Sequence, residues 1–350
     1  MKELIELQNL SNRYGNDPEY VLAGGGNTSF KDGATLYVKG SGTSLATIKA
    51  EDFVLLSRAK LDAMWDREYS DNEAQREQEV LADMMLARAE GETRRPSVET
   101  LLHNLFPQRF VLHVHPALIN GMTCGVCGKQ IAAELFPDSV WIDACRPGYI
   151  LASICRKALA FYREATGKDA SLLFLQNHGV FFAGNSVDEI DRLVEDTMST
   201  LRTYASGYEE CLRSLLGKAS GSEFVYFADF ADAAFLDPDS NSPTPDHIVY
   251  CKAFYLRAPR GVTPEQLSGL VKKFTDKNGY RPRVIIIEGE TVMLCADDRK
   301  TLDTVKAVFE DHCRVARNSV AFGGYLPMTD DLRDFIINWE VESYRAKQNK

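Results

Sequence analysis

The chain has 350 residues, of which 45% are apolar and 26% charged, and its formal net charge at pH 7 is −10. This length is enough for two domains with substantial cores, and the composition is that of an ordinary globular protein. The negative charge argues against nucleic acid or an anionic membrane surface as the main partner, although a local basic pocket for a small phosphate is compatible with it.

The N-terminal stretch MKELIELQNL is charged and amphipathic and lacks the apolar core of a signal peptide. No apolar run approaches the roughly eighteen residues that a membrane span requires. The eight cysteines are scattered along the chain, unlike the dense framework of a small disulfide-rich secreted domain. These features predict a cytoplasmic protein with reduced thiols. Cys124 and Cys127 have the spacing of a zinc knuckle or redox pair, but without a second pair we expect reduced, partly buried thiols.

The first predicted elements are a helix, a hairpin and two further helices. After the N-terminal helix, YVLAGGGNTSFKDGATLYVKGSGTS predicts a strand, a glycine-rich turn and a hairpin closed by Asp32-Gly33. Apolar residues recur at helical spacing over 50–66 and again over 74–89, which predicts a helix in each segment.

Three buried strands and a long helix are predicted next. FVLHVHP alternates like a strand and ends at Pro116, and SLLFLQ and VFFAG flank the short turn NHG as two buried strands. The long helix is predicted from about Val187 to Leu216, with Ser186 as its N-cap.

The composition changes in the segment 217–246, where LDPDSNSPTPDH is rich in Pro, Ser and Asp and predicts a surface linker. The elements expected after it are a strand, a helix, two strands and a helix, at 248–256, 263–277, 283–288, 291–295 and 299–317. We therefore predict an N-terminal domain over 1–216, a linker over 217–246 and a small α/β domain over 247–350.

Three histidines are candidates for a metal site. His113 and His115 lie one residue apart in a predicted strand, and side chains at i and i+2 leave the same face of a strand. An isolated His-x-His is more often one structural histidine beside an exposed one. His178, however, lies in the NHG turn, where an imidazole is not needed for packing. Together the three predict a site with three nitrogen ligands and an open position, as in catalytic zinc sites.

Glu99 lies two residues after Ser97, a good N-cap, and His103 follows it by one helical turn. Taken alone, Glu99 is explained by the dipole at a helix start. His247 and His312 fall in the second domain, and we expect them to be structural or surface residues.

Two glycine-rich turns, GGGNTS and KGSGTS, lie close together in the sequence. Their backbone N–H groups could face an anion, or they could serve only as flexible turns. A dinucleotide-binding fingerprint would require G-x-G-x-x-G at the start of a helix, whereas Gly24-Gly25-Gly26 opens a hairpin. A nicotinamide-dependent oxidoreductase therefore lacks its usual sequence support here.

The motifs GGGNTS, VKGSGTS, RPSVETLLH, HVHP, CRPG and QNHG follow one another across residues 24–179. Six motifs in this order resemble the class II aldolase and adducin head family. The later region, through FGGYLP and INWEVESYRAK, resembles the aldolase half of bacterial proteins that join rhamnulose-1-phosphate aldolase to a short-chain alcohol dehydrogenase. The resemblance does not extend to the dehydrogenase half.

The resemblance implies an α/β protein with a three-layer α/β/α domain and a mainly antiparallel sheet, usually assembled as a homotetramer with active sites between subunits. It also implies a zinc-dependent lyase that cleaves a ketose 1-phosphate, such as a rhamnulose or fuculose phosphate, to dihydroxyacetone phosphate and an aldehyde through an enediolate. The positions that match the family's zinc ligands are His113, His115 and His178, and Glu99 matches its catalytic acid/base.

The positions at which the family binds the substrate phosphate are Asn27, Ser41, Gly42 and Ser97. Many members have a second serine where this chain has Val98, which removes one phosphate donor. Two alternatives stay open within the resemblance. One is a pentulose-phosphate 4-epimerase, which breaks and remakes the same bond, and the other is a non-catalytic scaffold like the adducin head, which needs neither the glutamate nor the histidines.

Overall fold

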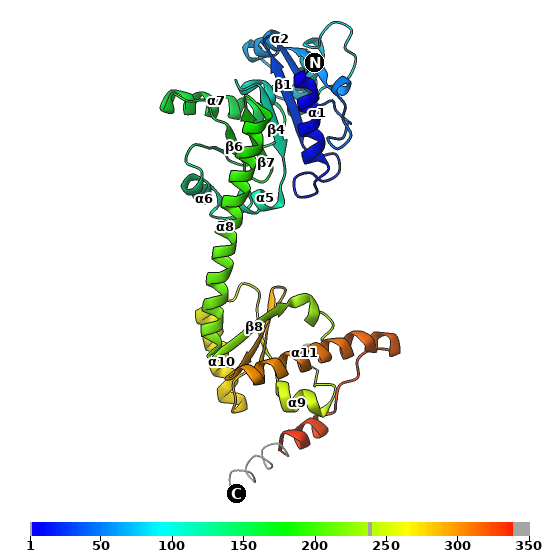
Figure 1. Cartoon of the computed structure of the whole chain (residues 1–350), viewed down its shortest axis with the longest axis vertical. Coiled ribbons are helices and arrows are strands. Elements are labelled where there is room, and N and C mark those ends of the chain that lie inside the picture. The colour runs from blue at the N-terminus through cyan, green and yellow to red at the C-terminus, as the bar shows by residue number, and fades with distance from the viewer. Residues whose placement is uncertain (1, 237–239, 339–350) are drawn as a thin grey trace. The chain divides into compact units, whose positions relative to one another are not determined.

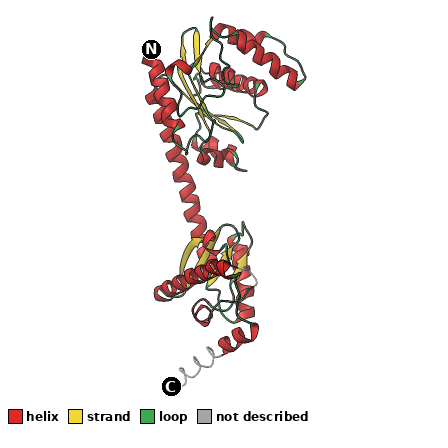
Figure 2. Ribbon diagram, turned by 90° about the vertical axis from the view of Figure 1, so that its right-hand side faces the viewer, coloured by secondary structure: helices red, strands yellow, loops and turns green. Residues whose placement is uncertain are grey.

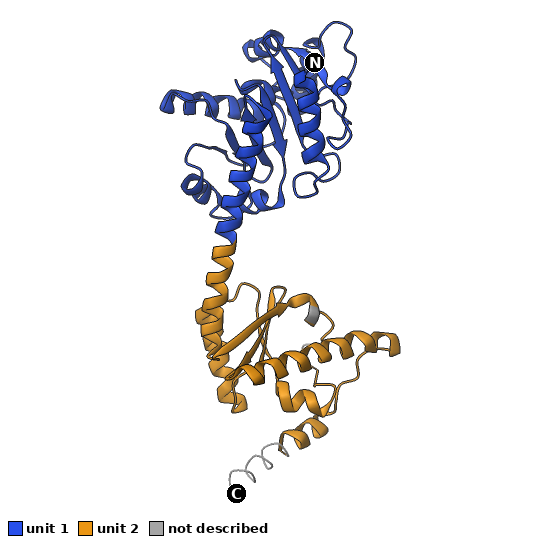
Figure 3. Cartoon of the chain, viewed as in Figure 1, with its two compact units in different colours: residues 1–205 blue, residues 206–350 orange. Residues whose placement is uncertain are grey.

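The computed structural model describes residues 2–236 and 240–338. The chain forms two compact units, residues 1–205 and 206–350 (Figure 3). Each unit has its own sheet with helices against it, as the colours of Figure 2 show. None of the described helices combines the length and apolar character needed to cross a membrane.

The first unit is built on a seven-stranded sheet. Its strands are β1 (Asn27–Asp32), β2 (Thr35–Val38), β3 (Val54–Ser57), β4 (Phe110–Val114), β5 (Val140–Ile142), β6 (Leu172–Leu175) and β7 (Gly179–Gly184). Its helices are α1 (Lys2–Gly15), α2 (Arg58–Ala63), α3 (Glu73–Leu86), α4 (Thr100–Leu105), α5 (Ala117–Thr123), α6 (Gly128–Leu135), α7 (Tyr149–Thr166) and the first part of α8 (Val187–Ser220), with short 3-10 turns η1 (Ala50–Asp52) and η2 (Met64–Asp66).

The strand order is β3-β2-β1-β4-β7-β6-β5, and every neighbouring pair is antiparallel except β5 and β6, which are parallel (Figure 1). The sheet is therefore mixed but mainly antiparallel, as predicted. β4, which carries two of the candidate metal ligands, lies at its centre between β1 and β7.

The two faces of this sheet are covered by different helices. Val111 packs into a core with residues of α2, α3, α4 and α7, whereas Leu112 and Val114 pack into a second core with α1, α5, α6 and α8. This alternation along β4 is the two-residue period of a strand buried on both faces. The first unit thus has the three-layer α/β/α architecture expected from the sequence.

Two predictions for the first unit differ from the structure. The segment predicted as one helix over 50–66 contains β3 between short helical turns, because Val54 and Leu56 are buried in the sheet. A short apolar run satisfies strand and helix periods alike, so its sequence does not separate the two. The strand expected from Tyr20 is also absent, and the first strand begins at Asn27.

The second unit is built on a four-stranded sheet. Its strands are β8 (Phe224–Asp229), β9 (Leu256–Ala258), β10 (Val284–Ile287) and β11 (Thr291–Ala296), in the order β8-β11-β10-β9. Its other elements are α9 (Pro245–Cys251), α10 (Pro264–Asn278), α11 (Arg299–Ser319), η3 (Phe230–Ala233) and η4 (Val320–Phe322). Only β9 and β10 run parallel.

This sheet is also buried on both faces. Val284 and Ile286 of β10 pack into the core that holds α11, and Ile285 and Ile287 pack into the core that holds α10. The second unit is therefore a small α/β layer structure, which agrees with the predicted fold class.

The segment 217–246, predicted as a linker, carries β8, which pairs with β11 along the edge of the second sheet. The Pro- and Ser-rich stretch that suggested a linker follows this strand, and residues 237–239 lie outside the described part of the chain. The strand predicted at 248–256 begins instead within the helix α9, because Pro245 in its first turn favours helix initiation, and β9 begins only at Leu256.

Candidate functional site

Two separate parts of the central sheet bring the three histidines together. His113 is the fourth residue of β4, and His115 follows the end of that strand. β4 pairs with β7, and the turn between β6 and β7 places His178 beside both of them. One ring nitrogen from each histidine lies within 4.8 Å of the others. The structure thus assembles the cluster that the strand spacing and the NHG turn predicted.

The hydrogen bond of His113 fixes which of its nitrogens faces the cluster. Its Nδ1 lies 2.9 Å from the carbonyl oxygen of Val180, so Nδ1 carries the proton and donates. Its Nε2 then presents a lone pair 2.9 Å from Nε2 of His115. Burial lowers the pKa of His113 to about 4, so the imidazole is neutral at pH 7.

Gly179 allows the strands to approach closely enough for this cluster to form. A Cβ at this position would lie 2.4 Å from Cδ2 of His115 and 2.7 Å from the carbonyl oxygen of Val114. Both distances are well inside van der Waals contact, so any larger residue would push the turn away from β4. The nearby Asn177 has a φ of 57°, a left-handed conformation that asparagine tolerates better than most residues.

Glu99 points into the same cluster. α4 begins at Thr100 rather than at Ser97, and the Glu99 side chain makes no capping hydrogen bond to that helix. Its Oε1 lies 3.4 Å from Nε2 of His113 and 3.3 Å from Nε2 of His178. The role as a simple helix-start glutamate is therefore not supported by the geometry.

The Glu99 carboxylate is 9% exposed and lies among groups that favour its ionised form. Burial by itself raises its pKa, but the adjacent His113 imidazole and the hydrogen bonds from His178 and Asn27 lower the pKa well below its usual value. The carboxylate is therefore ionised at neutral pH.

These groups fit a divalent metal ion. Two imidazole nitrogens in near contact, a third beside them and an ionised carboxylate oxygen lie together in one region, where each could coordinate an ion. Neutral imidazoles are the usual nitrogen ligands of zinc, and the Val180 carbonyl that orients His113 is the kind of outer partner that fixes a metal-binding tautomer. The residues that would hold the ion are His113, His115 and His178.

A chain of hydrogen bonds fixes the orientation of the Glu99 carboxylate through the oxygen that Asn27 contacts. Asn27 donates from Nδ2 to Oε2 of Glu99 at 2.5 Å, and its Oδ1 accepts a short hydrogen bond from Nε2 of His103. Nδ1 of His103 in turn accepts from the Ser29 hydroxyl at 2.8 Å. Because Ser29 can donate to Nδ1, the His103 proton sits on Nε2, and that proton sets the orientation of the Asn27 amide.

His103 was not predicted as a functional residue. Its only sequence signal is its position four residues after Glu99, a spacing that any helix would give. The side chain is fully buried and stacks edge-on against Phe181, so it holds Asn27 without being reached by solvent.

The positions expected to bind phosphate lie beside Glu99. A backbone bridge joins Gly40 to Pro96, Ser41 N–H donates to the carbonyl of Arg95, and this pairing brings the KGSG turn next to Ser97. The Ser97 hydroxyl oxygen accepts from the Glu99 N–H at 3.2 Å.

The exposure of these positions differs. Ser41 and Gly42 are exposed, Ser97 is buried, and Val98 is 55% exposed. The turn also carries Lys39, which the sequence did not single out. Its side chain is 6% exposed, and burial lowers its pKa while the charge of Glu99 raises it.

The remaining candidate residues lie outside this cluster. Cys124 and Cys127 are free thiols, and both are exposed rather than partly buried as expected. His247 and His312 are buried in the second unit with their rings 5.2 Å apart, which agrees with a structural role.

Residues 6–205 match the family model described as Class II Aldolase and Adducin N-terminal domain. A relative from Bacillus subtilis (strain 168), named "Uncharacterized oxidoreductase YuxG", is 32% identical over 411 residues, and the alignment covers 98% of this chain and 58% of the relative. The chain therefore spans little more than half of the length of that relative.

Two solved structures are similar to the first unit. The N-terminal class II aldolase domain of a conserved protein from Thermoplasma acidophilum is 26% identical, with a TM-score of 0.49, over 58% of this chain and 93% of that one. An L-fuculose-1-phosphate aldolase from Thermus thermophilus is 13% identical, with a TM-score of 0.40, over 59% of this chain and 95% of that one.

Proposed function

Because the chain belongs to the class II aldolase and adducin N-terminal domain family, we propose that it is a zinc-dependent aldehyde-lyase. The proposed substrate is a ketose 1-phosphate of the rhamnulose or fuculose type, and the products are dihydroxyacetone phosphate and an aldehyde. The observation that carries the proposal is the convergence of three histidine nitrogens and the Glu99 carboxylate on one region of the first unit.

His113, His115 and His178 would hold the metal. When bound there, a divalent cation supplies an electrophile for the carbonyl and neighbouring hydroxyl oxygens of the substrate, and three neutral ligands leave its positive charge undiminished. The buried position of His113 and its bond to Val180 keep that ligand fixed and neutral.

Glu99 moves the proton that the reaction requires. Breaking the carbon–carbon bond beside the ketone leaves an electron pair on the substrate carbon, and cleavage is completed when that carbon receives a proton. Oε1 of Glu99 faces the cluster while Oε2 is held by Asn27, so Oε1 is the proposed proton carrier. In synthesis the ionised Oε1 accepts the proton from the substrate carbon. In cleavage the hydroxyl whose oxygen becomes the aldehyde loses its proton, and Oε1 delivers a proton to the carbon that has gained the electron pair, so the proton count balances.

The phosphate end of the substrate is proposed to lie against Asn27, Ser41, Gly42 and Ser97. The second N–H of the Asn27 amide and the Ser97 hydroxyl proton stay available as donors, because the hydrogen bonds to Glu99 use only one amide proton and the hydroxyl oxygen. The buried Lys39 adds a cationic group from the same turn.

The longer relative supports a second part of the proposal. The alignment with the Bacillus subtilis protein includes the second unit as well as the first, and that relative extends beyond this chain. We propose that both units together correspond to the aldolase half of proteins that also carry a short-chain alcohol dehydrogenase. The word oxidoreductase in the relative's name would then refer to the part that this chain does not span.

We also propose that the chain acts in the cytoplasm as a homotetramer. Light scattering on the purified protein would give four times the mass of one chain if this assembly forms. A monomer that cleaves the substrate at full rate would contradict it.

The experiment that tests the proposed function is a screen of ketose 1-phosphates for release of dihydroxyacetone phosphate. We expect release of this product together with a free aldehyde, and loss of both after chelation. Interconversion of pentulose phosphates without a free aldehyde would instead identify a 4-epimerase. Absence of both activities in protein that contains no metal would favour a non-catalytic scaffold.

We predict that Asn27→Ala weakens binding of the phosphorylated substrate by about 1–3 kcal/mol, the usual effect of removing one partner of a buried charged group. Steady-state kinetics on the substrate found in the screen would show this as a raised KM. An unchanged KM would place the phosphate elsewhere.

His103→Phe is expected to disturb the orientation of Glu99 without removing the metal. The substitution keeps a ring of similar size but removes both hydrogen bonds, so the Asn27 amide and then Glu99 lose their fixed orientation. Small misplacement of a catalytic group can cost about 10–100-fold, and we expect that loss in kcat with little change in metal content. The matched variant Ser29→Ala, which removes only the outermost bond, should lose less. If folded His103→Phe retains the wild-type kcat, the hydrogen bonds from Ser29 through His103 to Asn27 do not position Glu99.

A further inference from the structure

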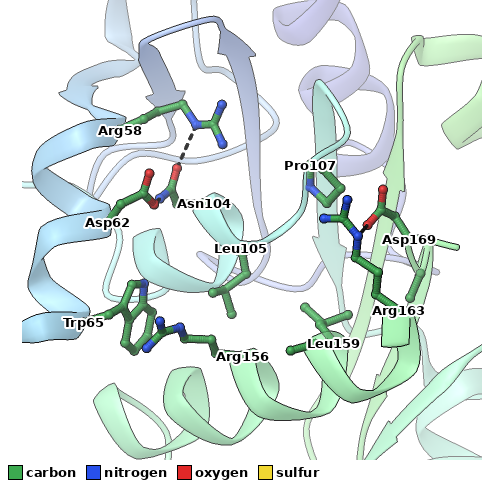
Figure 4. Close-up of a pocket in the computed structure, with 12 residues that line it drawn as sticks. Arg58, Asp62, Trp65, Asn104, Leu105, Pro107, Arg156, Leu159, Arg163 and Asp169 are labelled. Atoms are coloured by element: carbon green, nitrogen blue, oxygen red, sulfur yellow. Dashed lines mark hydrogen bonds and ion pairs between the residues drawn. The ribbon is translucent and has the colours of Figure 1, made fainter. Parts of the chain in front are cut away.

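A groove in the first unit lies apart from the histidine cluster. Its volume is about 420 Å³, and none of its lining residues belongs to the cluster or to the proposed phosphate site. One wall is formed by α2 and η2, the other by α7, and the end of α4 lies between them (Figure 4). The proposed lyase reaction makes no use of it.

Three arginines surround an apolar centre in this groove. Arg58 comes from the start of α2, whereas Arg156 and Arg163 lie on α7, two turns apart and therefore on one face of the helix. Figure 4 shows Leu105 and Leu159 between them. The groove thus offers separated guanidinium groups around a nonpolar middle.

Two of the arginines are held in place by neutral or aromatic neighbours. Arg58 donates from Nε to Oδ1 of Asn104 at 3.0 Å and from Nη1 to the carbonyl of Gly33 at 3.1 Å. The guanidinium of Arg156 lies 5.0 Å from the ring centre of Trp65. These contacts fix the two side chains yet leave several of their N–H donors unused.

Carboxylates balance only part of the positive charge in the groove. Arg163 lies 3.5 Å from Asp169, but neither Arg58 nor Arg156 makes an ion pair with a carboxylate in the parts of the chain that the structure describes. Asp62 also lines the groove, where its Oδ1 accepts a hydrogen bond from Asn104. Three arginines thus face two aspartates in a chain whose overall charge is −10.

A buried lysine lies near Arg58 without lining the groove. Lys31 is 3% exposed, and its ammonium donates to the carbonyl of Gln108 at 2.9 Å. Burial lowers the pKa of Lys31, and repulsion from Arg58 lowers it further.

We propose that this groove binds a small organic anion that carries two phosphate or carboxylate groups on a short neutral body. Arginine forks match the oxygen atoms of either group in paired hydrogen bonds, which makes them the usual recognition element for both. The separation of Arg58 and Arg156 from Arg163 suits a ligand charged at both ends, and Leu105 and Leu159 suit its hydrocarbon middle.

The test is calorimetric titration of the full-length, metal-loaded protein with three probes. Propanediol bisphosphate and glutarate have the same three-carbon body with phosphate or carboxylate ends, and propyl phosphate has one charged end only. We expect one of the two doubly charged probes to bind once per chain and about tenfold or more tighter than propyl phosphate. The stronger of the two identifies phosphate or carboxylate as the recognised group.

Variants assign that binding to the groove. Arg58→Gln combined with Arg156→Gln should weaken it by about tenfold or more, whereas Arg192→Gln, which removes an exposed arginine of α8, should leave it unchanged. Arg156→Gln alone, which removes the stacking on Trp65 but leaves the hydrogen bonds of Arg58 intact, replaces the double variant if that one does not fold. Asn27→Ala should also leave binding unchanged, which separates the groove from the proposed active site. The proposal is overturned if neither doubly charged probe binds, or if the groove variants bind it as tightly as the wild type.

Discussion

Glu99→Gln is expected to lower turnover by about 10²–10⁴-fold while the protein keeps its metal. Glutamine has nearly the same shape as glutamate and can still face Asn27, but it cannot give or take the proton that the substrate carbon exchanges. The three histidines are unchanged, so metal binding should persist, somewhat weakened if Glu99 also touches the ion. Turnover and metal content are measured on the same sample.

The matched control is Glu73→Gln. Glu73 lies in the first turn of α3, where it has the role that the sequence alone would assign to Glu99, and it is exposed. Glu73 also forms an exposed ion pair with Arg146, and exposed pairs contribute little to stability. A helix-start glutamate contributes about 0.3–1 kcal/mol through the dipole, so this variant should keep full turnover. If Glu99→Gln behaves like Glu73→Gln, the proposed role of Glu99 is wrong.

Replacing either strand histidine by alanine is expected to remove most of the metal and nearly all activity. Loss of an outer partner of a metal ligand commonly costs about 10–100-fold in affinity or activity, and loss of a ligand should cost more. His115→Ala is the milder variant, because this side chain is only half-buried, whereas His113→Ala leaves the Val180 carbonyl without its buried donor. Elemental analysis and a melting curve on each variant separate metal loss from unfolding.

His247→Gln provides the control for the two alanine variants of the strand histidines. His247 is buried but belongs to the second unit, and it contacts Thr244 rather than the cluster. Its substitution should leave the metal content at the wild-type value. Metal that remains at full occupancy in His115→Ala would rule out the assigned ligand set.

The parts of the site that the sequence predicts are those set by local geometry. His113 and His115 share one side of β4 because side chains alternate along any strand, and Val111 packs on one face of the sheet while Leu112 packs on the other, as expected. The buried runs on either side of the NHG turn likewise place His178 between two strands.

The partners of Glu99 could not be predicted in the same way. Whether its carboxylate turns towards a helix end or towards His113 depends on how α4 packs beside β1 and β4, which no local pattern specifies. The bond from Asn27 depends on the same packing, since Asn27 lies opposite His113 in the β1–β4 pairing. His103 was missed for this reason as well.

The second unit was harder to predict because the local composition around β8 suggests a linker, whereas β8 is a strand of the sheet. β8 has half-buried residues and precedes a Pro- and Ser-rich stretch, so its membership of the sheet becomes visible only through its pairing with β11. α9 was missed because a short run that includes Ile248 and Cys251 is apolar enough for a strand, whereas Pro245 favours the helix.

The most direct test of the central claim is the metal content of the wild-type protein, purified without chelator and measured by elemental analysis. The arrangement of His113, His115 and His178 predicts one divalent transition metal, zinc, for each chain. Protein that is folded and cleaves the substrate with no such metal present would contradict both the assigned site and the proposed reaction.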